Sequence, residues 1–113
     1  MTQLEPELEI EEIIEDHFLK LTLIYQGKQI GRAIGRVNAK VFYNIDIQIN
    51  ERLQELGIGT KLVEYQIKRA REIGLKLYET DLRYDEDLGI NFYKKLGFKI
   101  KTDQDGVKAS LKL

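Results

Sequence analysis

The sequence predicts an α/β domain with a mixed, mostly antiparallel sheet that contains a central parallel pair of strands. Three observations support this fold class. Apolar and polar residues alternate with period two through the first half of the chain, as in half-buried strands. The period changes to that of a helix after a glycine pair, Gly57 and Gly59. This helix and its connections are long enough for a right-handed crossover, which makes the strands on either side parallel.

Four strands are predicted in the first half, joined by short turns, so strands adjacent in sequence are antiparallel. Their alternating apolar residues are Leu8 and Ile10, then Leu19, Leu21 and Leu23, and in the fourth strand Ile45, Ile47 and Ile49. Turn signals lie at residues 16–17, 26–28 and 38–40, and the third strand lies between the last two. The segment after Pro6 also fits a short acidic helix, because Ile13 and Ile14 continue a helical spacing; the strand is favoured.

The second half has the pattern helix, strand, helix, strand, strand. The apolar face of the first helix consists of Leu62, Val63, Ile67, Ala70 and Ile73. Gly74 ends this helix as a left-handed cap, and residues 75–82 form the next strand. Acidic residues 85–87 begin a second helix that runs to Lys95, and a closing hairpin pairs residues 98–101 with 107–113. The order is therefore β-β-β-β-α-β-α-β-β in a single domain, residues 1–113.

The composition excludes several classes of function. Eighteen basic and nineteen acidic residues give a net charge of −1, without the basic excess of a nucleic-acid-binding protein. The chain has no cysteine, one histidine (His17, expected at the surface or in a turn) and one serine (Ser110), so neither a covalent hydrolase nor a zinc site is expected. The lack of cysteine, of a signal-peptide pattern and of a membrane-spanning apolar run predicts a cytoplasmic protein.

The glycine pair lies between the fourth strand and the first helix, and two interpretations of it are open. Backbone N–H groups at a helix N-terminus bind anions, and glycines let a phosphate approach the main chain. A tight turn without a ligand explains the same residues. The pattern is not a dinucleotide-binding fingerprint, because Leu62 replaces its third glycine. It is not a P-loop either, because Gly59 is followed by Thr60 and Lys61.

Two motifs resemble those of the GNAT superfamily of acetyl-CoA-dependent N-acetyltransferases. The segment QELGIG, residues 54–59, follows a predicted strand and is similar to the Q/R-x-x-G-x-G/A motif of that family. The segment INFYKKLGF, residues 90–98, resembles the downstream A-x-x-F-Y-x-K-x-G-F signature. The resemblance covers residues 41–98 well and the flanking strands in outline, and it implies a GNAT-like fold.

The resemblance implies acetyl-CoA as cosubstrate, and no metal. In the family, amides of the first motif hold the pyrophosphate. The pantetheine pairs like an extra strand with the fourth strand, whose edge is open where the crossover strand diverges. The implied cofactor-binding residues are Ile47, Gln48 and Ile49 on the fourth strand, Gln54, Leu56, Gly57, Ile58, Gly59, Thr60 and Lys61 at the first motif, and Glu86 and Tyr93 downstream.

Acetyl transfer to an amine needs an acceptor for the amine proton and an acid for the leaving thiolate. It needs no cysteine or serine nucleophile if the amine attacks directly. By resemblance, Tyr93 protonates the coenzyme A thiolate; core packing is its alternative role. Asp81, on the strand after the first helix, is a candidate base because some family members carry a carboxylate there; a surface carboxylate is the alternative. Asp46 is another candidate, and a water chain can serve instead.

The sequence departs from the family pattern at three places. Glu86 stands where an asparagine that contacts cofactor or water is common, and Gly89 replaces an alanine. The family also inserts two helices between the first two strands, whereas residues 14–18 leave room only for a turn. We therefore expect one side of the acceptor site to be open to a bulky acceptor, such as a protein, or to be closed by the second subunit of a homodimer.

Three functions are compatible with these observations. The leading hypothesis is an N-acetyltransferase that moves an acetyl group from acetyl-CoA to a primary amine of a protein lysine, an N-terminus or a small molecule. The alternative is a GNAT-like module that binds acetyl-CoA or coenzyme A as a sensor or interaction domain without transfer. In the third, a structural domain, the glycines shape only a turn. No nucleic-acid or membrane partner is expected.

Overall fold

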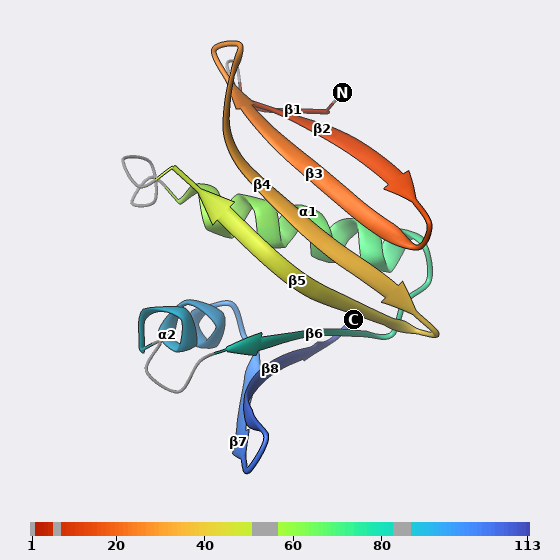
Figure 1. The fold of residues 1–113 in the computed structure, drawn as a ribbon, viewed down its shortest axis with the longest axis vertical. Coiled ribbons are helices and arrows are strands. Elements are labelled where there is room, and N and C mark those ends of the chain that lie inside the picture. Colours follow the sequence, from red (N-terminus) through yellow and green to blue (C-terminus); the bar gives the residue numbers. More distant parts are fainter. Residues whose placement is uncertain (1, 6–7, 51–56, 83–86) are drawn as a thin grey trace.

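The computed structural model describes residues 2–5, 8–50, 57–82 and 87–113. Their elements are β1 (Thr2–Glu5), β2 (Leu8–Glu15), β3 (Phe18–Tyr25), β4 (Lys28–Asn38), β5 (Val41–Ile49), α1 (Ile58–Glu72), β6 (Leu77–Leu82), α2 (Asp87–Lys95), β7 (Lys99–Asp103) and β8 (Gly106–Lys112). The strands form one sheet in the order β1-β2-β3-β4-β5-β6-β8-β7 (Figure 1). This is the mixed α/β architecture that the sequence predicts.

Strands β2 to β5 form the antiparallel meander expected from their alternating pattern. Their turns place Asp16, His17, Gln26, Gly27 and Ala39 in the left-handed backbone region. The segment after Pro6 is strand β2 and not the alternative helix. The sequence-based prediction lacks strand β1, which pairs with β2, because its four residues are too few to display a period.

Helix α1 is the crossover that joins the two parallel strands, β5 and β6. It is followed by Gly74 in left-handed conformation, as predicted. The strand predicted from Leu75 begins instead at Leu77, because the Leu75 N–H still donates to the Ala70 carbonyl of the helix (2.9 Å). Strand β8 lies between β6 and β7 and pairs antiparallel with both.

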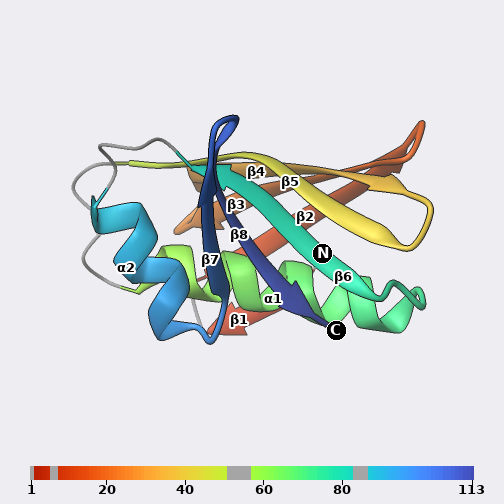
Figure 2. The same ribbon diagram turned by 90° about the horizontal axis from the view of Figure 1, so that it is seen from below.

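Both helices lie on one face of the sheet, which we call the helix face (Figure 2). Among the described residues, no helix covers the opposite face, the outer face. Strands β2 and β3 are joined by a tight hairpin, with Glu15 opposite Phe18, so a turn stands where the resemblance implies two inserted helices, as predicted. Neither helix in the described part of the chain has the length and apolar run required to cross a membrane.

Candidate active site

The two parallel strands separate at the pair Asn44 and Thr80, which we call the fork. Beyond the fork, β5 continues to Ile49 in a ladder with β4. A β-bulge leaves Ile45 without a residue opposite it on β4 and bends β5 at this point. No described strand pairs with the β6-facing edge of residues 45–48, and Figure 1 shows the two strands diverging. The open edge that the sequence predicts on this strand is therefore present.

The N-terminus of α1 is an uncapped cluster of amides. Its N-cap, Gly57, has a left-handed backbone (φ 74°, ψ 15°) that favours glycine. Among the described residues no side chain caps the helix, and its first turn contains no acidic residue. The Lys61 N–H donates to the Gly57 carbonyl (3.2 Å), so the amides of residues 58–60 have no intrahelical acceptor. This end of the helix is suited to bind an anion.

The two glycines of the motif have different surroundings. A Cβ added at Gly57 would meet nothing within 4 Å. A Cβ added at Gly59 would lie 3.3 Å from Ile49 Cδ1 and 3.7 Å from the Phe92 ring, so this glycine lets α1 pack closely against β5 and α2. Approach of a phosphate, which the sequence suggests at both glycines, therefore has open space at Gly57, whereas the missing side chain of Gly59 serves packing.

The predicted cofactor-binding residues of β5 border the opening. Ile47 and Ile49 are partly buried against the core on the helix face. Gln48 points to the outer face, where its Oε1 accepts a hydrogen bond from Arg32 Nε (3.1 Å). In the first turn of α1, the predicted residue Ile58 is buried, and Thr60 and Lys61 are half-buried. The remaining predicted residues, Gln54, Leu56 and Glu86, lie outside the described residues.

Tyr93 lies on α2 with its side chain buried, 6% exposed. Its ring centroid is 5.0 Å from that of Phe92 and 5.1 Å from that of Phe98, in edge-on geometry. Its side chain is also hydrogen-bonded to that of Tyr78 on β6. Tyr93 thus packs in the core, as its alternative role requires, and also has a polar contact on the helix face.

A chain of buried polar side chains lies on the helix face of the fork. The Tyr78 hydroxyl donates to Gln66 Oε1 (2.6 Å), and Gln66 Nε2 donates to Asn44 Oδ1 (3.1 Å). Asn44 Nδ2 donates to Thr80 Oγ1 (3.4 Å), and the Thr80 hydroxyl donates to the main-chain carbonyl of Asn44 (3.1 Å). Burial, and then the neighbouring Tyr93, raise the pKa of Tyr78 well above 10.

The sequence analysis did not identify these polar residues, although one signal for them exists. Gln66 lies one helical turn after Leu62 and one helical turn before Ala70, so it belongs to the buried face of α1. A polar side chain on such a face needs a hydrogen-bond partner. Its partners come from β5 and β6, and no local pattern connects those strands to the helix.

On the outer face of the fork, the Asp81 carboxylate accepts a hydrogen bond from the Tyr43 hydroxyl. Asp81 is the first residue of β6 beyond the fork, and it is exposed. Burial, then the hydrogen bond to Asp81 and its charge, raise the pKa of Tyr43 to about 12. The Tyr43 phenol therefore stays protonated and holds this carboxylate in place near neutral pH. Glu79, on the same face, pairs instead with Lys108 Nζ (3.4 Å).

Asp46, the other candidate base, lies beyond the bulge, paired with Ile34. It is exposed and lines a hollow of the outer face together with Lys20 and Arg32. The two diverging strands of the fork therefore each carry an accessible carboxylate on the same face.

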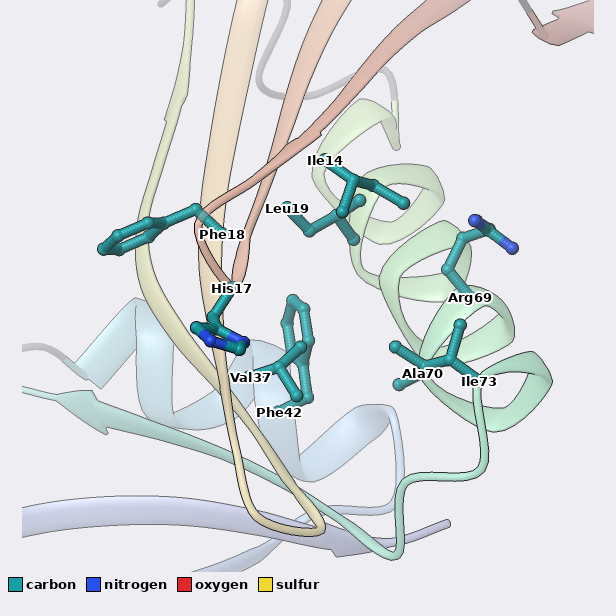
Figure 3. Close-up of a pocket in the computed structure, with 9 residues that line it drawn as sticks. All are labelled: Ile14, His17, Phe18, Leu19, Val37, Phe42, Arg69, Ala70 and Ile73. Carbon is teal, nitrogen blue, oxygen red and sulfur yellow. The ribbon is translucent and has the colours of Figure 1, made fainter.

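A separate apolar hollow of about 210 Å³ lies between the β2–β3 turn and the C-terminal part of α1 (Figure 3). It is lined by Ile14, His17, Phe18, Leu19, Val37, Phe42, Arg69, Ala70 and Ile73. Arg69 is held by Glu12, with Nε 2.7 Å from Oε1, and His17 lies in the turn, as predicted. None of the predicted site residues lines this hollow, so it is distinct from the opening at the fork.

The fold of this chain is similar to that of solved acetyltransferases. A model of the acetyltransferase (GNAT) family matches residues 2–98, and a search of curated proteins found no match. A GNAT family acetyltransferase from Elizabethkingia anophelis with acetyl-CoA bound has a TM-score of 0.84 at 13% identity, over 96% of this chain and 100% of that chain. The PaiA N-acetyltransferase from Thermoplasma acidophilum in complex with coenzyme A has a TM-score of 0.80 at 19% identity, over 86% and 62%. The ribosomal-protein-S18-alanine N-acetyltransferase from Escherichia coli has a TM-score of 0.78 at 23% identity, over 87% and 70%. The match therefore spans less than two thirds of the Thermoplasma protein and the whole of the Elizabethkingia one.

Proposed function

This chain belongs to the acetyltransferase (GNAT) family, and we propose that it transfers the acetyl group of acetyl-CoA to a primary amine by direct attack of the amine on the thioester. The observation that carries the proposal is the chemistry on the two faces of the fork. Asp81 is exposed on the outer face, and Tyr93 contacts Tyr78 on the helix face. A thioester in the opening would have a base on one side and an acid on the other.

The residues around the opening fit acetyl-CoA. Its pyrophosphate would accept hydrogen bonds from the amides at the start of α1, where Gly57 leaves open space and no acidic side chain of the first turn repels it. Its pantetheine would add to the β6-facing edge of β5 at Ile47 and Gln48, next to Ile49. When bound, acetyl-CoA supplies an acetyl group activated as a thioester.

Asp81 and Tyr93 would then each carry out one proton transfer of the reaction. Asp81 accepts a proton from the amine as the amine nitrogen bonds to the acetyl carbon, and later releases it to solvent. Tyr93 donates its proton to the sulfur as the carbon–sulfur bond breaks, and solvent reprotonates it. Tyr43 holds Asp81 in place through its hydrogen bond. Such positioned acids and bases contribute about 100-fold or more to a rate.

We infer that the acceptor amine approaches from the outer face. Asp81 and Asp46 are exposed there, and in the described part of the chain no helix stands over them (Figure 2). A lysine side chain or the N-terminus of a protein fits such an open face without steric hindrance from the described residues, and so does a small amine. If a second subunit covered this face in a homodimer, only small amines could act as acceptors.

Titration calorimetry with acetyl-CoA tests the cofactor site. The wild type should bind acetyl-CoA saturably, and Gly57→Glu should lose binding, because it places a negative side chain where the pyrophosphate would lie. Gly27→Glu is the matched control. Gly27 has a similar backbone (φ 77°) and equally open surroundings, but it lies in the β3–β4 turn, so this variant should bind as the wild type does. Equal binding of acetyl-CoA by both variants would refute the proposed pyrophosphate site at Gly57.

Release of coenzyme A thiol, measured with a panel of amines, peptides and proteins as acceptors, tests the transfer. Turnover should require acetyl-CoA and an acceptor, and Tyr93→Phe should lower kcat while acetyl-CoA still binds. Tight binding without turnover for any acceptor would favour the alternative, a module that holds acetyl-CoA as a sensor.

A further inference from the structure

The outer face of the sheet carries its charges in stripes that follow the strands. Exposed side chains on this face are acidic on β2, basic on β3 and β4, and acidic again on β5 and β6. They include Glu11, Glu15, Lys20, Arg32, Arg36, Asp46 and Asp81. The basic stripe therefore lies between two acidic ones, and only β5 separates it from the opening at the fork.

Two residues of the basic stripe, Lys20 of β3 and Arg32 of β4, line the hollow that Asp46 borders. We call Lys20 and Arg32 the basic pair. The volume of the hollow is about 500 Å³, within the range of sites that bind small ligands or single side chains. Lys20, Ile34 and Asp46 stand in one row across β3, β4 and β5. The hollow thus has a carboxylate on the side of the fork and cations farther from it.

Neither member of the basic pair forms an ion pair with a carboxylate in the described part of the chain. Arg32 Nε donates to the neutral Gln48 Oε1 (3.1 Å), which leaves the two terminal amino groups of the guanidinium for an end-on pair with an incoming carboxylate. Lys20 has apolar residues opposite it on both sides, Ile13 and Ile34. Two cations in one hollow repel each other, and an anion between them removes this repulsion.

The spacing of the strands relates the basic pair to the reaction. Adjacent strands are about 4.8 Å apart, so a thioester beside the open edge of β5 would lie about 10 Å from β4, the strand of Arg32. An extended peptide covers this distance in about three residues. Asp46 and Asp81 attract a protonated amine to the fork and repel a carboxylate from it. An acceptor with a positive end and a negative end about 10 Å apart therefore fits this face in one orientation.

We propose that the preferred acceptor is an acidic peptide, whose N-terminal amine enters the fork while a carboxylate of its third or fourth residue pairs with Arg32 and Lys20. The inference rests on the proposed function, in which the amine attacks the thioester from the outer face. The basic pair does not touch the reacting atoms, so it determines which acceptor binds and not how fast a bound acceptor reacts. Single exposed ion pairs are weak, and the selectivity requires both cations to act on the same anionic segment.

Three peptides with one primary amine each test the selectivity. They are Ala-Ala-Glu-Glu-Ala-Tyr and its analogues with Gln-Gln or Arg-Arg in place of Glu-Glu, all amidated at the C-terminus. Release of coenzyme A thiol is measured at saturating acetyl-CoA. The wild type should have a kcat/KM about tenfold higher for the acidic peptide than for the neutral one, as expected for two partly solvated ion pairs, and the basic peptide should be the poorest acceptor. Equal values for the acidic and neutral peptides would overturn the proposal.

Charge variants assign the selectivity to the basic pair. The double variant Lys20→Gln/Arg32→Gln should raise KM for the acidic peptide about tenfold and leave kcat, and KM for the neutral peptide, within about twofold. Lys20→Gln alone, which keeps the hydrogen bond between Arg32 and Gln48, should show part of this loss. Arg32→Glu should reverse the order and make the basic peptide better than the acidic one. A double variant that still prefers the acidic peptide would overturn the proposal.

Lys101→Gln is the matched control. Lys101 of β7 is also an exposed cation, and its pairing with Lys108 places it on the outer face beyond the other side of the fork. Its replacement should leave the preference for the acidic peptide unchanged. If Lys101→Gln lowers the preference as much as the loss of the basic pair does, the net charge of the face and not a site would set it, and the proposal would be overturned.

Calorimetry with the N-acetylated peptides in the presence of coenzyme A provides a readout that needs no turnover. The wild type should bind the acetylated acidic peptide about tenfold more tightly than the acetylated neutral one, and this difference should shrink as salt screens the exposed charges. The double variant should bind both alike. Equal binding of the two peptides by the wild type would overturn the proposal.

Failure of this inference and failure of the proposed function give different results. Thiol release with small amines, without discrimination among the three peptides, would overturn this inference alone. A wild type that binds no acetyl-CoA, or that releases no thiol with any acceptor, would overturn the proposed function and this inference with it, whatever the peptide binding.

Discussion

The two faces of the fork carry tyrosines in contrasting environments. On the helix face, Tyr78 is fully buried and belongs to a network that links α1, α2, β5 and β6. On the outer face, Tyr43 is only partly buried, and its hydroxyl donates to the exposed carboxylate of Asp81. A substitution on the helix face must therefore disturb the packing of several elements, whereas one on the outer face changes a local group that solvent and an acceptor can reach.

This difference indicates that the two faces of the fork have different roles. The helix face determines the shape of the opening, because its contacts join elements that are distant in sequence. The outer face determines what can react there, because its carboxylates are accessible. Apart from the proposed acid Tyr93, changes on the helix face should mainly lower stability, and changes at the carboxylates of the outer face should mainly lower activity.

Gly35→Ala should have the largest effect on stability. Gly35 is buried on the helix face, next to the ring of Phe42, which an added methyl group would overlap. Overpacking of this kind should lower the free energy of unfolding by about 3 kcal/mol, measured by urea denaturation. Arg36→Ala is the control: Arg36 is the next residue and exposed on the outer face, and its loss should cost less than about 0.5 kcal/mol. Equal costs would remove the distinction between the faces.

Asp81→Asn should have the largest effect on activity. The amide cannot accept the amine proton, so kcat/KM for acetyl transfer should fall about 100-fold, while urea denaturation should detect little change. Glu79→Gln on the same face, whose ion pair with Lys108 is partly exposed, should leave kcat/KM nearly unchanged. Asp46→Asn distinguishes the two candidate bases. A larger loss of kcat/KM in this variant than in Asp81→Asn would identify Asp46 of β5 as the base.

Thr80→Val should have an intermediate effect on stability. The isosteric side chain keeps the shape of the strand but removes the hydroxyl that donates to the Asn44 carbonyl and accepts from Asn44 Nδ2. Leaving buried polar groups without partners should cost about 1–2 kcal/mol of unfolding free energy. Thr22→Val makes the same change on the outer face, at a half-buried site in β3, and should be close to neutral. A neutral Thr80→Val would show that the network does not stabilise the fork.

Tyr43→Phe should have the smallest effect on stability, visible mainly in alkali. The folded-state pKa of Tyr43 is about 12 against an ordinary value of 10.0, so the folded protein retains this proton where the unfolded chain loses it. The stabilisation is complete below pH 10 and is lost as the pH rises towards 12. Urea denaturation at pH 8 and pH 11 should therefore show a smaller loss of stability in Tyr43→Phe than in the wild type. The same loss of stability in both proteins would contradict the raised pKa of Tyr43.

Much of the fold is predictable because its signals are local. The alternation at Leu19, Leu21 and Leu23 places a strand, and the left-handed residues of the turns fall where Gln26-Gly27 and Asn38-Ala39 indicate a reversal. The start of the crossover strand is predicted too early, because the helix cap at Gly74 continues into Leu75. The position of β8 between β6 and β7 is a tertiary choice, for which the chain offers no local pattern.

The candidate site is predictable only in part. The motif locates Gly57 at the start of α1, and the strand pattern locates Ile47, Ile49 and Asp81 beside the opening. The separate roles of the two glycines do not follow from their spacing, because Gly59 is determined by its contacts with Ile49 and Phe92.

The sequence by itself determined the order of the elements from β2 onwards, the antiparallel meander, the parallel crossover and the place of the glycine motif. Periodicity, turn residues and helix caps act within a few residues of the chain, so they can be recognised without coordinates. Only the tertiary structure decided that Asn44, Gln66, Tyr78, Thr80 and Tyr93 share one buried network while Asp81 and Tyr43 lie on the opposite face. Contacts between residues distant in sequence depend on where the strands separate and how the helices pack on them, and these are properties of the whole fold.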